Sequence, residues 1–194
     1  QSAKELGITD TNLWIYPGYD HDENIDSYLN NKTDEFPLLY LSFASSKDPM
    51  WEKNHPGTAT MEAITLSSFD DFDNWSRKSW RKRGDDYESY KEEISQKIID
   101  VIYKHLPHLK DKISYYELST PLSTRDMAHY SKGELYGLNH TPSRFRQKWL
   151  KPKTPIKGLY LTGQDILTAG LAGALSAGAL TTSVILKKNL FKSI

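Results

Sequence analysis

A short apolar segment, a glycine turn and a long run of small residues follow one another near the end of the chain, and this order restricts the fold most. Residues 158–162 (Gly-Leu-Tyr-Leu-Thr) predict a strand, and Gly163-Gln164-Asp165 predicts a tight turn. Residues 168–189 then predict a long helix. That helix is rich in small residues, namely Gly170, Ala172, Gly173, Ala174, Ala177, Gly178 and Ala179.

Small residues at the start of this predicted helix keep its main-chain N–H groups accessible to a bulky ligand. A helix N-terminus carries roughly half a positive charge, which favours an anion or an electron-rich carbonyl. The pyrimidine edge of a flavin presents such a carbonyl, and Asp165 offers an acceptor for a sugar-like hydroxyl. The segment therefore predicts contacts with the ribityl chain and ring edge of a flavin.

The same helix has a second interpretation as a membrane span. Residues 166–186 contain no charge, and three lysines follow at Lys187, Lys188 and Lys192. Against a span, alanine and glycine outnumber leucine and isoleucine, and several hydroxyl side chains interrupt the segment. A helix that follows a strand through a glycine turn is also typical of a buried crossover. The cofactor-facing helix is the favoured interpretation, while a tail-anchored helix and plain core packing stay open.

Composition narrows the class of protein. With 194 residues, the chain is long enough for one ordinary domain or two small ones. Lysine plus arginine and aspartate plus glutamate both number 25, so the formal net charge is zero. No overall electrostatic field therefore attracts nucleic acid. The absence of cysteine excludes disulfides, thiolate metal sites and a cysteine nucleophile, and it fits a cytoplasmic protein. Peripheral association with a membrane stays open.

The start of the chain shows no signal-peptide pattern. Residues 1–7 lack a charged stretch followed by an apolar one, and the first residue is Gln1 rather than methionine. We expect either a processed chain or a part of a longer polypeptide.

The first third of the chain predicts a small antiparallel sheet. Residues 13–16, 37–43 and 58–66 are strand-like segments separated by turn formers. Because the strands lie so close in sequence, we expect one packed face and one face free for a ligand or another domain. Between the first two strands, residues 20–31 are polar and predict a capped helical turn around Ile25, Tyr28 and Leu29.

The middle of the chain predicts helices. Apolar residues recur at helical spacing from Tyr87 to Leu106, with Asp85 or Asp86 as the expected cap and Pro107 as the end. Residues 70–80 predict a shorter amphipathic helix. Residues 113–118 predict a strand, and a short helix is expected to begin near Ser123 or Thr124.

Other candidate sites have simpler interpretations. The basic run at residues 77–83 is flanked by aspartates that cancel it, so we expect a solvated surface and no nucleic-acid site. His105 and His108 lack a further ligand nearby, and residues 20–23 lack the glycine and distal glutamate of a calcium loop. Ser123, Asp126 and His129 lie too close in sequence for a hydrolase triad, and no Gly-x-Ser-x-Gly elbow is present. We predict no metal site.

The flavin-like segment resembles a known family. The run Leu161-Thr162-Gly163-Gln164-Asp165 followed by Gly170-Leu171-Ala172-Gly173-Ala174 is similar to the C-terminal flavin-binding motif of the phytoene desaturase superfamily of FAD-dependent oxidoreductases. Within it, the likeness is to the branch of retinol saturases and carotenoid isomerases. The likeness extends over most of the chain, through the segments 12–17, 45–49, 120–122 and 133–138.

This resemblance implies an α/β fold in which an inserted substrate domain divides an FAD/NAD(P)-binding domain. Our chain is expected to be an α+β, C-terminal part of it. Residues 1–127 are then a portion of the substrate domain with its antiparallel sheet. Residues 128–194 are the C-terminal portion of the FAD domain, with the strand, turn and helix.

The resemblance also implies a function. The expected reaction is the reduction of a carbon–carbon double bond in an apolar, retinoid- or carotenoid-like polyene. Isomerisation or desaturation by the same superfamily and a non-enzymatic, partner-binding module are the alternatives. NAD(P)H is a candidate electron donor. The residues expected to contact FAD are Gly163, Gln164, Asp165, Gly170, Leu171, Ala172, Gly173 and Ala174, and those expected along the substrate path are His129, Tyr130, Glu134 and Tyr136.

This chain departs from the family pattern in one respect. It has no Gly-x-Gly-x-x-Gly turn after an early strand, which is the element that binds the pyrophosphate of a dinucleotide. We therefore expect the ADP half of FAD to depend on a partner, the missing N-terminal portion of the FAD domain. The isolated chain is expected to be inactive.

Overall fold

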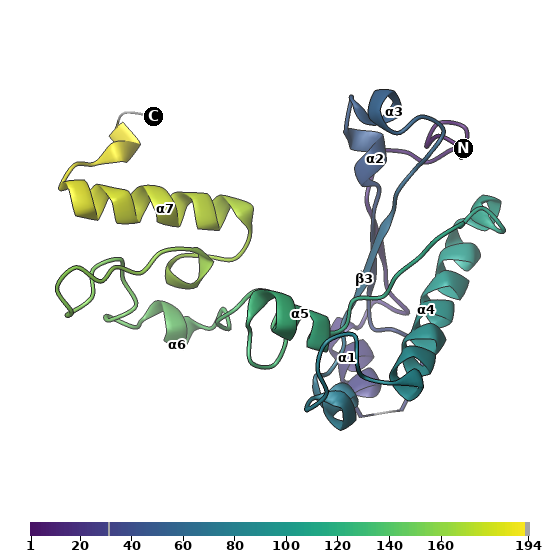
Figure 1. Ribbon diagram of the computed structural model, residues 1–194, viewed down its shortest axis with the longest axis horizontal. Helices are drawn as coiled ribbons and strands as arrows, with labels where there is room; N and C mark the ends of the chain where they lie inside the picture. The colour runs from purple at the N-terminus through teal and green to yellow at the C-terminus, as the bar shows by residue number, and fades with distance from the viewer. Residues whose placement is uncertain (31, 193–194) are drawn as a thin grey trace. The chain divides into compact units, whose positions relative to one another are not determined.

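The computed structural model describes residues 1–30 and 32–192, and the chain divides into two compact units. Unit 1 comprises Gln1–Pro121 and unit 2 begins at Leu122. In Figure 1 unit 1 is coloured purple to teal and unit 2 green to yellow. The identification of residues 1–127 with a substrate domain and of residues 128–194 with an FAD domain stays a prediction.

A three-stranded antiparallel sheet forms the centre of unit 1, as predicted. Its strands are β1 (Leu13–Ile15), β2 (Leu39–Ser42) and β3 (Glu62–Thr65), in the order β1-β2-β3. Along β2, Leu39 and Leu41 are buried while the residues between and after them are only partly so. One face of the sheet is therefore packed and the other is free.

The packed face lies against the long helix α4 (Asp85–His105), which runs beside the sheet in Figure 1. Ile98 and Ile102 of this helix join Leu39 and Leu41 in the core of unit 1. The helix was predicted with nearly these bounds, because its apolar residues recur every three to four positions. Its N-cap differs: Gly84, at φ 94°, occupies that position, and the predicted caps Asp85 and Asp86 lie in the first turn.

The shorter elements of unit 1 fill the connections. Helix α1 (His21–Leu29) confirms the predicted capped turn, because the Asp20 side chain accepts a hydrogen bond from the Glu23 N–H at 3.0 Å. The remaining elements of the unit are α2 (Ala44–Lys47), α3 (Trp51–Asn54) and the 3₁₀ helices η1 (Asp70–Trp75) and η2 (Pro107–Leu109).

The amphipathic helix predicted over residues 70–80 is wrong in type and length, since only η1 forms there. Side chains three residues apart lie on the same side of a 3₁₀ helix, so Phe72 and Trp75 face one way. Both pack on Tyr90 of α4, with ring centroids 5.5 and 5.4 Å away. The aromatic side chains of this segment thus reach α4 without an α-helix of their own.

The strand predicted over residues 113–118 is also wrong. These residues are irregular, because none of their main-chain groups has a hydrogen-bonding partner among the described residues. Side chains hold the segment to α4 instead: the Tyr116 hydroxyl donates to Glu92 Oε1 at 2.5 Å and accepts from Gln96 Nε2 at 2.8 Å.

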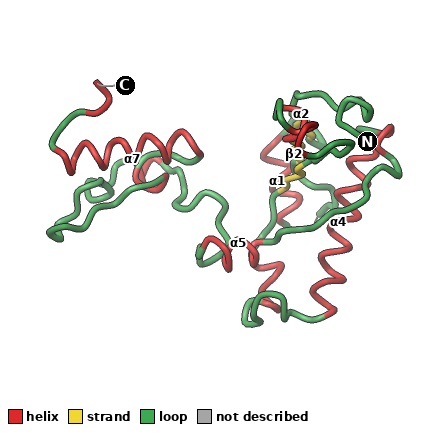
Figure 2. The backbone as a smooth tube through the Cα atoms, turned by 45° about the horizontal axis from the view of Figure 1, so that its top comes forward, coloured by secondary structure: helices red, strands yellow, loops and turns green. Residues whose placement is uncertain are grey.

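Unit 2 contains few regular elements, and loops and turns make up most of the chain between its first and last α-helices (Figure 2). Helix α5 (Pro121–Ala128) confirms the predicted short helix and begins at Pro121, a residue favoured in a first turn. The later elements are α6 (Pro142–Phe145), the 3₁₀ helix η3 (Gln164–Ile166), α7 (Leu171–Leu186) and the 3₁₀ helix η4 (Leu190–Lys192).

The strand predicted over residues 158–162 is reduced to one bridge, between Lys153 and Tyr160. A strand needs a neighbour for its ladder, and here the Leu161 N–H bonds to the Pro152 carbonyl at 2.9 Å. The Leu161 carbonyl accepts from Thr181 of α7, also at 2.9 Å. The predicted strand is thus a segment without a ladder of its own, and a hydrogen bond from Thr181 holds it to α7.

Helix α7 is shorter than predicted, with 16 residues. It begins after Gly170, at φ 90°, and ends at Lys187, whose left-handed φ of 52° stops the helix. No helix in residues 1–30 and 32–192 combines the length and the apolar character needed to cross a membrane.

We predict that Leu41→Ala lowers the free energy of unfolding of the protein by about 3 kcal/mol, because it empties a fully buried site. The matched change Leu66→Ala removes the same atoms from a side chain that is 44% exposed, and it should cost less than about 1 kcal/mol. Chemical denaturation of the two variants measures both values. Equal losses would contradict the packing of the sheet on α4.

Candidate functional site

The side chain of Gln164 connects the turn before α7 with two other segments of unit 2. Its Oε1 accepts a hydrogen bond from the Gly170 N–H at 3.3 Å, and its Nε2 donates to the Tyr130 hydroxyl at 3.2 Å. Gly163, at φ 90°, precedes the turn. Three of the residues predicted from the sequence, Tyr130, Gln164 and Gly170, therefore lie together.

The carboxylate of Asp165 packs against the turn at Gly137. Its Oδ1 accepts from the Leu138 N–H at 3.0 Å, while no described residue bonds to its Oδ2. Gly137 has a φ of +69°, and a Cβ at this position would lie 2.2 Å from Asp165 Oδ1. The close approach requires glycine there. One oxygen of Asp165 is thus used by the fold, and the other is available to a ligand.

The first turn of α7 leaves main-chain donors without acceptors. The N–H groups of Leu171, Ala172 and Gly173 have no hydrogen-bonding partner in the described part of the chain, and no side chain caps the helix. Leu171, Ala172 and Ala174 are exposed, so side chains do not close this end. Gly173 is buried, and a Cβ there would lie 1.9 Å from the Thr168 carbonyl oxygen, so this close approach requires glycine.

Arg144 was not predicted from the sequence, yet its side chain holds the main chain of the turn at residues 163–165. Its side chain is buried, and its Nη2 donates to the carbonyls of Gln164 and Asp165 at 3.0 and 2.6 Å. Its Nε and Nη1 are buried with no partner among the described residues. The signal in the sequence is indirect: Thr141 caps the short helix α6 that positions Arg144, and its side chain accepts from the Arg144 N–H.

His140 is a second residue that the sequence did not reveal. Its Nε2 accepts from the Ala169 N–H at 2.7 Å, one residue before the glycine that precedes α7. Accepting this bond requires that Nε2 carry no proton. His140 and Gln164 therefore fix two consecutive amides, at Ala169 and Gly170, and so fix where α7 begins.

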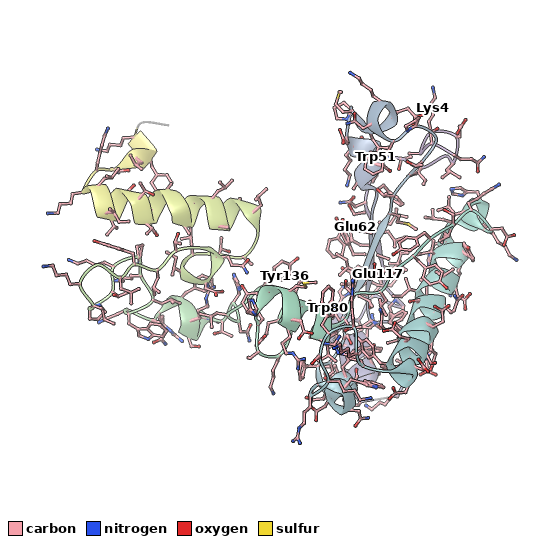
Figure 3. The ribbon with its side chains drawn as sticks, viewed as in Figure 1. Lys4, Trp51, Glu62, Trp80, Glu117 and Tyr136 are labelled. Carbon is pink, nitrogen blue, oxygen red and sulfur yellow. The ribbon has the colours of Figure 1, made fainter. Side chains whose placement is uncertain are left out.

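The other residues predicted along a substrate path do not join this group. His129 is exposed, with a φ of 61° at the end of α5, and Tyr136 is 56% exposed (Figure 3). Glu134 accepts from the Lys132 N–H at 2.9 Å. Hydrogen bonds from its own main-chain N–H and from that of Lys132 lower the Glu134 pKa. Glu134 thus stabilises a local turn, and only Tyr130 of the four contacts the site.

The arrangement offers donors and an acceptor on neighbouring segments. Three free N–H groups at a helix N-terminus suit an electron-rich carbonyl, and a half-buried carboxylate oxygen suits a hydroxyl. These are the two kinds of group that the predicted contacts with the ring edge and ribityl chain of FAD require, and binding of FAD stays a prediction. Among the described residues, no three histidine, aspartate or glutamate side chains gather as a metal site would require.

We predict that Gly137→Ala lowers the free energy of unfolding by at least about 1 kcal/mol more than Gly158→Ala does. Both positions have positive φ, which costs an L-residue about 1 to 2 kcal/mol, but Gly158 has no atom within 4 Å of its Cβ direction. At Gly137 the new methyl group must also displace the Asp165 carboxylate from Leu138. Denaturation curves of the two variants test this, and equal losses would contradict the contact.

Relatives of known name match the whole chain. The all-trans-retinol 13,14-reductase of Macaca fascicularis is 35% identical over 202 residues, which cover 100% of this chain. The Homo sapiens protein of the same name is 34% identical over 200 residues. A Danio rerio protein, 33% identical over 197 residues, is named an inactive all-trans-retinol 13,14-reductase. No family model matches the chain, and no solved structure is significantly similar to it.

The matched region covers the whole of this chain but only part of each relative. The chain spans about a third of the length of the curated relatives it matches. Along its whole length it is homologous to that third of the all-trans-retinol 13,14-reductases, which confirms the likeness to the retinol saturase branch that its motifs predict.

Proposed function

We propose that this chain is the C-terminal part of an FAD-dependent oxidoreductase that reduces a carbon–carbon double bond of a retinoid-like polyene. The names of the relatives support the reaction and the class of substrate. The observation in the structure that carries the proposal is the uncapped start of α7 beside the free oxygen of Asp165. One relative is named inactive, so sequence similarity alone does not establish activity.

The proposed contacts with FAD lie on two segments of unit 2. The N–H groups of residues 171–173 would donate to the ring-edge carbonyl, and Asp165 Oδ2 would accept from a ribityl hydroxyl. Gln164 and His140 hold these groups in place through the amides of Gly170 and Ala169. When bound and reduced, FAD would supply a hydride to one carbon of the double bond, and a proton taken up by the other carbon would complete the addition of two hydrogens.

The free face of the sheet in unit 1 offers a surface for an apolar substrate. Trp14, Tyr40 and Ile64 are directly opposite one another across the three strands, so their side chains form one row. Trp14 is 59% and Ile64 42% exposed, and the rings of Trp14 and Tyr40 are 4.5 Å apart. A conjugated chain packs favourably along such a row, because burial of apolar and aromatic surface drives its binding.

Unit 2 exposes apolar side chains that a water-soluble domain normally buries. Leu171 and Leu175 of α7 are 81% and 68% exposed, and Leu159 before the turn is 47% exposed. We propose that the remaining N-terminal portion of the FAD domain covers them and supplies the glycine-rich turn for the pyrophosphate. NAD(P)H as electron donor, a cytoplasmic location and peripheral membrane contact belong to the same proposal.

The full-length protein, supplied with FAD, a reductant and all-trans-retinol, tests the reaction directly. We predict a yellow protein and a product heavier than retinol by the mass of two hydrogens, measured by mass spectrometry. A product of unchanged mass with altered geometry identifies an isomerase, and one that has lost hydrogens identifies a desaturase. A colourless protein that leaves the polyene unchanged contradicts a flavoenzyme.

We predict that Asp165→Ala in the full-length protein weakens FAD binding about tenfold or more, because a hydrogen bond to a charged acceptor is lost. Fluorescence titration of the apoprotein with FAD measures the dissociation constant. Asp165→Asn retains an oxygen for the Leu138 N–H, so it separates loss of the ligand contact from loss of the turn. Asp10→Ala, at an exposed site in unit 1, is the control. Unchanged affinity in both Asp165 variants contradicts the assignment.

A further inference from the structure

Two stretches of unit 1 leave main-chain hydrogen-bonding groups unpaired, namely the outer edge of β3 and residues 113–118. β3 pairs with β2 and has no second neighbour in the described part of the sheet. Residues 113–118 (Ile-Ser-Tyr-Tyr-Glu-Leu) have the composition of a strand, yet their main-chain groups bond to no described residue. Each stretch therefore presents a row of N–H and C=O groups that is open to pairing.

A cavity of about 550 Å³ lies between these two stretches. Met61 and Ala63 line it from the side of β3, and residues 112–118 line it from the other side. Figure 3 labels one residue of each stretch, Glu62 and Glu117. The cavity is thus bordered by an edge strand, β3, and by a segment with the composition of a strand, residues 113–118.

The base of this cavity belongs to α4 and is apolar. Ile98, Ile99 and Ile102 line it and are themselves buried among the core side chains. The opposite side lies toward solvent, where Tyr115 is 78% exposed. An occupant needs apolar groups toward α4 and polar groups toward water. An amphipathic strand meets this requirement, because successive side chains point to opposite faces.

The unpaired main-chain groups of β3 and of residues 113–118 indicate which kind of molecule fills the cavity. A small apolar molecule fills the space above the isoleucines but leaves the N–H and C=O groups of both rows unpaired. An extended peptide offers alternating donors and acceptors on each side, and this is how a strand adds to a sheet edge. The relatives extend well beyond the third of their length that this chain covers, so further polypeptide is the nearest source of such a strand.

We propose that an extended segment from the part of the polypeptide outside these 194 residues inserts between β3 and residues 113–118. It pairs with β3, brings residues 113–118 into the sheet as the next strand, and places alternate apolar side chains on Ile98 and Ile102. This inference does not depend on the proposed function, since it concerns the packed side of unit 1 and involves no residue of the flavin site.

Native-state hydrogen exchange of the full-length protein, resolved by residue, tests the insertion. An edge strand protects only alternate amides, whereas a strand with two neighbours protects all of them. We expect all amides of residues 62–65 to be protected as those of β2 are, with exchange slowed on the order of a hundredfold or more, and residues 113–118 to show protection at alternate positions. Strand β2, which has a neighbour on each side, is the internal reference.

Three results would overturn the proposal. The first is alternating protection in β3 together with unprotected amides throughout residues 113–118. The second is protection that grows with protein concentration, which identifies a second copy as the occupant. The third is protection that appears only when retinol is added, which identifies a small ligand. Flavin absorption of the same sample shows separately whether the proposed function holds.

A pair of proline variants gives an independent test. Ser114→Pro and Tyr115→Pro each remove one N–H at an exposed position of an irregular segment, and proline is tolerated where that N–H has no partner. Because alternate N–H groups of a strand point to opposite sides, only one of the two should lower the midpoint of thermal unfolding of the full-length protein. Equal midpoints for both variants contradict the insertion.

Discussion

The hydrogen bond from the Gly170 N–H to the Gln164 side chain is the contact on which the candidate site depends. It places the start of α7 against the turn at residues 163–165, and His140 fixes the preceding amide in the same way. Gly170 has no side chain, so it cannot cap the helix as serine or aspartate does. The N–H groups of residues 171–173 consequently have no partner among the described residues, and they are available to an acceptor.

The supports of the turn are arranged so that its polar groups need not move to bind a ligand. Arg144 donates to the carbonyls of Gln164 and Asp165, which fixes the main chain, while the Leu138 N–H fixes one carboxylate oxygen. The second oxygen then has a defined direction before any ligand arrives. Binding sites of this kind lose little entropy when they are occupied, because their side chains are already ordered.

The sequence correctly predicted those helices and strands that form because of their own residues. Strand-like segments between turn formers predicted the sheet, helical spacing predicted α4, and the polar segment that begins at Asp20 predicted α1. The strands over residues 113–118 and 158–162 were wrong, because a strand also depends on a neighbour that its own residues do not encode. Arg144 and His140 were missed for a related reason. Their hydrogen-bonding partners lie about 20 and 29 residues away in the sequence, and no local sequence pattern indicates these contacts.

On the proposed function, the two units carry complementary chemistry. Unit 2 contributes main-chain N–H groups and a carboxylate, which suit the polar edge and tail of a flavin but offer little to a hydrocarbon. Unit 1 contributes the aromatic row at Trp14 and Tyr40, which suits a polyene but has no means of holding a redox cofactor. Reduction of one double bond in an apolar polyene requires both, because the hydride donor must be held rigidly and water must be kept from the reacting carbons.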